Sequence, residues 1–473
     1  MRKFFLILLL SFPVTIFSSE GVKLEENLPL YSVLPFIGVL LSISFFPLFF
    51  PDFWHKRYPL ISLLWGLIFA IPFILAYKSL AMVEILRMFL LEYLPFLILL
   101  WGLFTVSGGI YFKGTLVGTP IFNTILLLVG TFFSSFMGTT GSAMLFIRPL
   151  LRANEKRKYK THIFIFFIFL VANIGGSLTP IGDPPLFLGF LSGVPFLWTL
   201  RLFLPLIFVS AILLIIFFII DYNLFKKENL YPILKTLTKK KREKIKLCGL
   251  NNFFLLLLIV LSVIFSGYTN LSELKVLSVN INFQDLLRDM MIVIIGIVSL
   301  LTTKKEYRKE NRFTFEPIKE VAILFGAIFV TMIPALEILR AGAKGHLGFL
   351  VGGINEPIQY FWLCGFLSSF LDNAPTYLTF LNMALGTFYS QIPEREAINL
   401  LIQEKGLFLE AISIGAVFMG ANTYIGNAPN FMVKSIAEEN GVKMPTFLGY
   451  IFKWSLPILI PIFFLVGLIF LRG

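Results

Sequence analysis

Two long apolar stretches of the sequence are interrupted by nearly the same polar motif. Residues 176–185 read GSLTPIGDPP and residues 420–429 read GANTYIGNAP, an offset of 420 − 176 = 244. Proline lacks an amide hydrogen and clashes with the preceding helical turn, and it also pushes the residue before it out of the helical conformation. Neither stretch can be one continuous helix. Each therefore predicts two half-helices joined by a polar loop.

A second pair of polar segments lies upstream of the first. Residues 134–142 read SSFMGTTGS and residues 368–376 read SSFLDNAPT, an offset of 368 − 134 = 234. In a membrane protein, helix-breaking segments at matching positions of two halves indicate a substrate site near the bilayer midplane. The sequence therefore predicts a secondary active transporter.

The composition places the chain in a membrane. Hydrophobic residues make up 57% and charged residues 14%, unlike a soluble domain. The net charge of +13 falls in short loops between apolar runs, which is typical of membrane topology and argues against nucleic-acid binding. The two cysteines and three histidines have no metal-ligand spacing. We expect an all-α polytopic transmembrane protein in contact with membrane lipid, without a cofactor.

The apolar segments form two sets of six, which suggests two halves. They cover residues 31–50, 59–77, 86–112, 121–151, 163–196 and 199–220, and then 252–267, 288–302, 317–339, 358–389, 409–434 and 447–471. We predict a first repeat at 20–222, a basic cytoplasmic linker at 223–250 and a second repeat at 251–473. Residues 1–19 resemble a signal peptide, with an uncleaved anchor helix as the alternative.

Basic loops predict the orientation of the segments. The cytoplasmic loops would hold His55-Lys56-Arg57, Arg152 to Lys160, the central linker and Lys304 to Arg312. This threading works only if 121–151 is a re-entrant hairpin and 358–389 is a hairpin that opens on the other side. The two repeats then have inverted topology. The acidic residues Glu20 to Glu26 and the C-terminus lie outside a bacterial-type inner membrane.

The four interruptions supply the candidate ion- and substrate-binding residues. These are Thr139, Thr140 and Ser142 at the first hairpin tip, Thr179 and Asp183 at the first break, Asp372, Asn373 and Thr376 at the second tip, and Asn422, Thr423 and Asn427 at the second break. Half-helix N-termini favour anions, whereas hydroxyl, carbonyl and carboxylate oxygens favour cations such as Na⁺.

Asp183 and Asp372 are the candidate Na⁺ ligands. A charged side chain at the bilayer centre costs at least ~2.5–3.5 kcal/mol, so an acid there indicates function. Burial disfavours an ionised carboxylate and a bound cation favours it, so a proton and Na⁺ would compete for one site. Each aspartate could instead cap a half-helix. Acids nearer the segment ends, among them Asp221, are interpreted as interfacial.

The same motifs carry a resemblance to known transporters. The stretch NIGGSLTPIGD at 173–183 resembles the signature of NhaD-type sodium/proton antiporters, and LDNAP at 371–375 resembles an element found there and in arsenite-pump relatives. The double hairpin is similar to the fold of citrate carriers and other divalent anion/sodium symporters. The chain is thus identified as a member of the ion transporter superfamily, which implies a homodimer and elevator-type alternating access.

The substrate remains open between two hypotheses. Sodium/carboxylate symporters carry Ser-Asn-Thr at both hairpin tips, whereas residues 138–140 here read GTT and residues 372–374 read DNA. We therefore expect Na⁺/H⁺ antiport, with Na⁺ and H⁺ as the transported ions. The alternative is cation-coupled transport of citrate or a dicarboxylate. The antiporter pattern is also incomplete, because PPLF at 184–187 replaces a hydroxyl-rich continuation. No histidine dyad or serine nucleophile motif supports an enzyme, and symmetric broken helices suit alternating access better than a channel.

Overall fold

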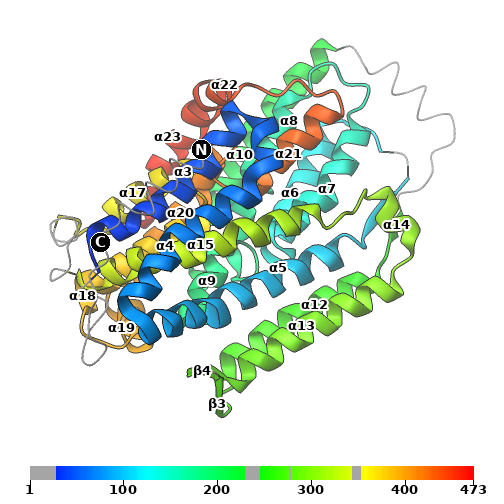
Figure 1. Cartoon of the computed structure of the whole chain (residues 1–473). Coiled ribbons are helices and arrows are strands. Elements are labelled where there is room, and N and C mark those ends of the chain that lie inside the picture. Colours follow the sequence, from blue (N-terminus) through cyan, green and yellow to red (C-terminus); the bar gives the residue numbers. More distant parts are fainter. Residues whose placement is uncertain (1–27, 115, 229–245, 277, 343–352, 473) are drawn as a thin grey trace.

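The computed structural model describes residues 28–114, 116–228, 246–276, 278–342 and 353–472, and the described chain is mainly helical (Figure 1). Residues 1–19, the acidic stretch 20–26 and residues 229–245 of the predicted linker lie outside the described residues. Eight helical stretches in the described part are long and apolar enough to cross a membrane. They are Leu30–Phe49, Pro51–Ser107, Pro120–Met137, Thr161–Leu178, Phe196–Lys227, Asn251–Tyr268, Glu316–Arg340 and Phe447–Phe470. The all-α polytopic prediction is confirmed.

The first half contains the six expected segments. In chain order its elements are the 3₁₀ turn η1 (Leu30–Val33), α3 (Leu34–Phe49), α4 (Pro51–Arg87), the π-helical turn η2 (Met88–Tyr93), α5 (Leu94–Ser107), β1 (Tyr111–Lys113), α6 (Pro120–Met137), α7 (Thr139–Ala153), α8 (Thr161–Leu170), η3 (Ile174–Leu178), α9 (Pro184–Ser192), η4 (Phe196–Leu202) and α10 (Phe203–Lys227).

The second half follows the same order of a hairpin and then a broken helix. Its elements are β2 (Lys246–Cys248), α12 (Asn251–Tyr268), β3 (Glu273–Val276), β4 (Val279–Asn282), α13 (Phe283–Thr302), α14 (Lys305–Glu310), α15 (Glu316–Arg340), α17 (Pro357–Phe370), α18 (Asn373–Tyr389), α19 (Glu394–Glu404), α20 (Gly406–Met419), η6 (Gly420–Asn422), α21 (Ala428–Glu439), α22 (Phe447–Tyr450), the π-helical turn η7 (Ile451–Leu459) and α23 (Ile460–Phe470). The antiparallel strand pairs β1–β2 and β3–β4 are minor additions.

The first broken helix is deeply buried in protein. Nine consecutive residues of α8, His162 to Leu170, are buried, and so is the adjoining turn η3 except for its last residue. Unwound backbone at membrane depth is tolerated only where protein or a wet cavity surrounds it. The burial of α8 and η3 meets that requirement, because protein surrounds the break that follows them. At the periphery, α12 and α13 pack together and against α5 (Figure 1).

Several segment boundaries differ from the sequence prediction. The basic triplet His55-Lys56-Arg57, expected in a loop, lies inside α4, which begins at Pro51 because proline fits the first turn of a helix. The same helix extends to Arg87 through a non-helical backbone at Lys78 (φ 51°, ψ −121°). The segment predicted at 86–112 ends as a helix at Ser107, and the following residues form β1.

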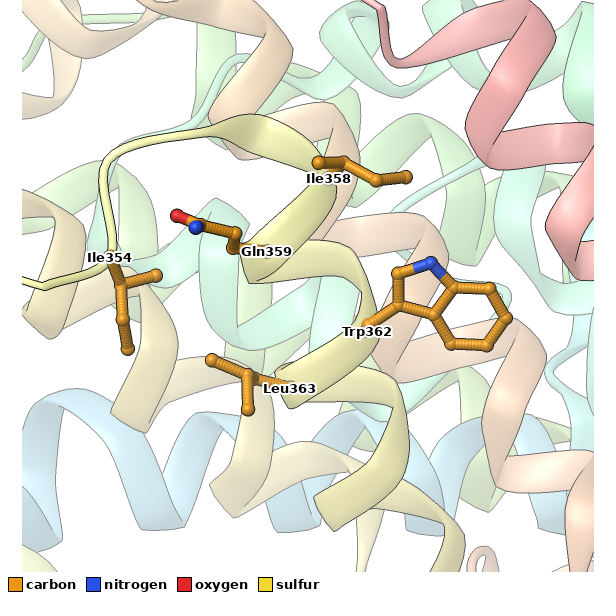
Figure 2. Close-up of a pocket in the computed structure, with 5 residues that line it drawn as sticks. All are labelled: Ile354, Ile358, Gln359, Trp362 and Leu363. Carbon is orange, nitrogen blue, oxygen red and sulfur yellow. The ribbon is translucent and has the colours of Figure 1, made fainter.

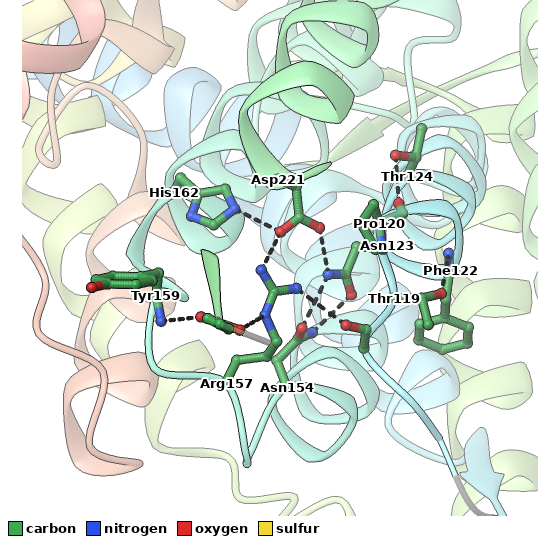
Figure 3. Close-up of polar contacts among 12 residues, drawn as sticks. Thr119, Pro120, Phe122, Asn123, Thr124, Asn154, Arg157, Tyr159, His162 and Asp221 are labelled. Atoms are coloured by element: carbon green, nitrogen blue, oxygen red, sulfur yellow. Dashed lines mark hydrogen bonds and ion pairs between the residues drawn. The ribbon is translucent and has the colours of Figure 1, made fainter. Parts of the chain in front are cut away.

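Asp221, interpreted from the sequence as interfacial, is a buried residue with several bonded partners. It is fully buried near the end of α10, where its Oδ1 accepts bonds from Arg157 Nη2 (2.7 Å) and His162 Nε2 (2.9 Å) (Figure 3). Its Oδ2 accepts a bond from Asn123 Nδ2 at 2.9 Å. Arg157 also donates its Nε to Glu228 at 2.6 Å. We call these five residues the buried ion cluster. It joins the start of α6, the α7–α8 loop, α8 and the end of α10.

Candidate ion and substrate site

Asp183, at the first break, accepts hydrogen bonds from one side chain of each of the other three interruptions. Thr139 Oγ1, at the first hairpin tip, donates to Asp183 Oδ1 at 2.8 Å. Asn373 Nδ2, at the second tip, donates to Asp183 Oδ2 at 2.6 Å. Asn427 Nδ2, at the second break, donates to Asp183 Oδ1 at 3.2 Å. All four residues are at most 2% exposed. We call them the Asp183 cluster, and it contains four of the eleven residues selected from the sequence.

The two breaks have the same backbone geometry. Asp183 (φ −143°, ψ 143°) and Asn427 (φ −153°, ψ 139°) both stand directly before a half-helix. Thr179 donates its hydroxyl to Ser135 O and Thr423 donates its hydroxyl to Ser369 O. These matching bonds confirm that the two motifs are structural counterparts. The inverted orientation of the two repeats relative to a membrane stays a prediction.

Glycine allows each break to fold back on itself. A Cβ on Gly182 would stand 2.1 Å from Gly176 O, and a Cβ on Gly426 would stand 2.5 Å from Gly420 O. No side chain fits at such a distance. This close approach brings the polar loop of each break against the start of its own motif, which places Asp183 and Asn427 at the centre of the site.

The two hairpin tips begin their second helices differently. At the first tip, Gly138 adopts φ 77°, and Thr139 N donates to Gly182 O at 2.9 Å. At the second tip, Asp372 caps α18 by accepting a bond from Ala374 N at 3.1 Å. Asp372 therefore has the capping role weighed in the sequence analysis. No hydrogen bond joins the Asp372 and Asp183 carboxylates.

The other predicted residues support the loops or stand beside the cluster. Ser142 donates to Gly130 O (2.9 Å), and Thr376 donates to Asp372 O (2.9 Å). Asn422 donates its Nδ2 to Ser369 Oγ at 2.9 Å. Thr140 is only half-buried and takes no part in the bonds to Asp183. Thr179 and Thr423 are used by the loop bonds described above.

Two asparagines next to the cluster were missed by sequence reasoning. Asn173 and Asn430 are fully buried and bonded to each other, Asn173 Nδ2 to Asn430 Oδ1, at 2.6 Å. Asn173 Oδ1 also accepts a bond from Asn427 Nδ2 at 3.3 Å. The signal was available, because each is an amide inside an apolar segment within ten residues of a break.

Two features define what the site can bind. Four helix N-termini converge on it, because α7, α9, α18 and α21 begin directly after Gly138, Asp183, Asp372 and Asn427. Such ends carry a partial positive charge that favours anions. The side-chain oxygens Asn373 Oδ1 and Asn422 Oδ1 are buried and accept no hydrogen bond from any described residue. These oxygens suit a cation, so the site offers features for both charges.

A separate cavity of about 350 Å³ lies at the start of α17 and holds none of the predicted site residues. It is lined by Ile354, Ile358, Gln359, Trp362 and Leu363 (Figure 2). Its lining is largely apolar, and the polar atoms of the Asp183 cluster are not part of it. The candidate site is therefore the buried Asp183 cluster and not this cavity.

Comparison with known protein families gives a match over nearly the whole chain. The model of a family described as "Putative citrate transport" matches residues 25–471. Comparison with individually curated proteins gave no match. The matched region includes both hairpins, both breaks and all eleven residues selected from the sequence. The chain therefore belongs to this citrate transport family of membrane transporters.

Proposed function

We propose that this protein is a secondary active transporter of citrate or a related di- or tricarboxylate, coupled to a cation. The observation that carries the proposal is the convergence of four helix N-termini on the Asp183 cluster. The partial positive charge at those ends would attract a carboxylate-rich substrate. The family described for citrate transport supports the same substrate class. This was the alternative hypothesis from the sequence, and it now takes precedence over antiport.

The coupling cation would reconcile the anionic substrate with the two acids. Asp183 and Asp372 would repel a carboxylate, and no lysine or arginine of the described chain bonds to either of them. A cation held by the oxygens of Asp183 and Asn373 would neutralise this repulsion. The substrate would then bind beside the cation, against the helix ends. Na⁺ and H⁺ are the candidate cations.

Na⁺/H⁺ antiport is the second candidate function. The absence of a basic partner for Asp183 within the described residues favours it, because an anion site often includes arginine or lysine. Under this reading the cluster exchanges Na⁺ for protons and carries no organic substrate. For both candidates we propose an inner-membrane location, a homodimer with elevator-type movement and an extracytoplasmic C-terminus.

Reconstitution in liposomes tests the two candidates in parallel. Citrate-class transport predicts accumulation of labelled citrate when an inward Na⁺ or proton gradient is imposed. Antiport predicts that added Na⁺ collapses a pH gradient without citrate. If neither carboxylate accumulates nor Na⁺ affects the gradient, both candidates are wrong. Accumulation of citrate without any effect of either cation gradient would reject the coupled mechanism.

Charge removal in the cluster tests the site. Asp183→Asn, which alters three bonds to a charged group, is expected to lower transport at least ~100-fold, and Asp372→Asn, which alters one, about 10- to 150-fold. The folded protein should keep its normal elution volume. Glu316→Gln is the matched control, because Glu316 is an exposed carboxylate at the start of α15. Full transport by Asp372→Asn would reduce Asp372 to a helix cap, and full transport by Asp183→Asn would contradict an ion-binding role for Asp183, whose side chain makes no cap bond.

A further inference from the structure

The Asp183 cluster continues into a chain of three buried amides. Asn427 Nδ2 donates toward Asp183 Oδ1 (3.2 Å) and toward Asn173 Oδ1 (3.3 Å). Asn173 Nδ2 donates to Asn430 Oδ1 at 2.6 Å. Asn430 Nδ2 then donates to Gly420 O (2.8 Å) and to Thr423 O. The chain therefore runs from the carboxylate at the first break to the backbone of the second break.

The backbone carbonyls fix the direction of every amide in this chain. Both hydrogens of the Asn430 amide are used by the two carbonyls of the second break, so its Oδ1 must face Asn173. Both hydrogens of the Asn173 amide are used by Asn430 Oδ1 and Ile168 O, so its Oδ1 must face Asn427. Asn427 must therefore present its Nδ2, and not its Oδ1, toward Asn173 Oδ1. Asp183 Oδ1 lies on the same side, so an N–H group of Asn427 also points toward Asp183. Reversing one amide would place oxygen against oxygen at a fully buried position.

Asn427 has more acceptors than hydrogens. Its Nδ2 carries two hydrogens but lies within reach of Ala172 O (3.1 Å), Asp183 Oδ1 and Asn173 Oδ1. The three distances are similar, from 3.1 to 3.3 Å, at the upper end of the usual range for an N–H···O bond or just beyond it. Asn173 Oδ1 therefore offers a ready alternative acceptor when a cation or proton occupies Asp183 Oδ1. The amide can then turn its hydrogen from Asp183 to Asn173.

The first break folds without such a chain. With the offset of 244, the counterpart of Asn173 is 173 + 244 = 417, a valine, and the counterpart of Asn430 is 430 − 244 = 186, a leucine. Both breaks nevertheless have the same backbone geometry around Asp183 and Asn427. The loop conformation therefore does not require these two amides. Each amide is present in only one of the two halves, Asn173 in the first and Asn430 in the second, which indicates a role tied to the single carboxylate at Asp183.

We propose that Asn173 and Asn430 are positioning residues that report the occupancy of Asp183 to the second break. They aim the Asn427 amide, and they pass its movement to the carbonyls of Gly420 and Thr423. Thr423 in turn donates its hydroxyl to Ser369 O in the second hairpin. Cation binding at the first break is thus linked to the loop and hairpin of the second half. This inference rests on the proposed cation site.

The test measures cation binding rather than transport. Wild-type protein in detergent is titrated with Na⁺ at fixed pH and, separately, with protons in the absence of Na⁺. Thermal unfolding is the readout, because a ligand that binds the folded state raises the midpoint temperature of unfolding. Asn173→Leu and Asn430→Leu are each expected to raise the half-saturating cation concentration about 2- to 12-fold, the range for one net hydrogen bond. The double variant should show no more than the larger single effect.

Three controls separate this role from a structural one. Asn382→Leu is the matched variant, because Asn382 is a buried amide bonded only within α18, to Leu378 O at 3.0 Å, and its half-saturation should equal that of wild type. If the leucine variants do not fold, Asn173→Ser and Asn430→Ser carry the same expectation, since serine is too short to bridge. Unchanged half-saturation in folded variants overturns the inference, and so do additive effects.

Failure of the proposed role of Asn173 and Asn430 can be distinguished from failure of the citrate assignment. If wild-type protein responds to a cation but never accumulates citrate, the citrate assignment fails and the two asparagines can still be tested. If wild-type protein responds to neither Na⁺ nor protons, the inference fails, because there is no occupancy to report.

Discussion

Removal of the Asp221 carboxylate should destabilise the protein more than any surface substitution. Asp221→Ala deprives three donors of their acceptor, at 2.7 Å from Arg157 and at 2.9 Å from both His162 and Asn123. Bonds to charged groups contribute about 1.5–3 kcal/mol each, but such values do not add within one cluster. Arg157 keeps its bond to Glu228 at 2.6 Å. The cost of breaking a buried ion pair, about 3–5 kcal/mol, is therefore the better guide.

Denaturant unfolding in detergent measures this loss. Asp221→Ala is compared with Asp52→Ala, which removes an exposed carboxylate at the start of α4 and should change the free energy of unfolding by less than ~0.5 kcal/mol. Asp221→Asn keeps one acceptor oxygen and should fall between the two. If Asp221→Ala unfolds at the same denaturant concentration as Asp52→Ala, the buried ion cluster does not stabilise the fold as its geometry indicates.

Two further outcomes follow from the site. The double variant Asp183→Asn/Asn427→Asp moves the carboxylate from the first break to the second. Its citrate uptake should stay as low as in Asp183→Asn, because a carboxylate at 427 would face the fixed Asn173 oxygen. Recovery of uptake would contradict the amide directions. Gly182→Ala should destabilise the protein by at least ~1–3 kcal/mol, since its Cβ would meet backbone at 2.1 Å, whereas Gly66→Ala has open space and should be tolerated in the same melting assay.

The interruptions of the fold could be predicted from sequence because their causes are local. Pro180 and Pro184 stand among glycines that also disfavour a helix, and the structure breaks there, whereas Pro72 of α4 and Pro334 of α15 lie inside helices. The meeting of Thr139, Asp183, Asn373 and Asn427 was also expected from the pairing of the motifs, although their individual bonds were not.

The remaining features depend on partners far away in the sequence. Asp221 was judged by its place near a segment end, but its burial is decided by Arg157 and Asn123, 64 and 98 residues away. Asn173 was quoted within a motif without a role, because its partner Asn430 lies 257 residues later. Local hydrophobic pattern contains no information on which buried face meets which.

The contact between Asp183 and Asn427 also bears on the history of the chain. These residues are counterparts in the two halves, yet they touch each other at 3.2 Å. If both halves were identical and carried aspartate, two carboxylates would share one buried position, and both could not be ionised at once. Divergence of one copy to asparagine removes that conflict and supplies a donor in place of a second charge. A duplicated gene could therefore form this contact between Asp183 and Asn427 only after its two copies had diverged at this position.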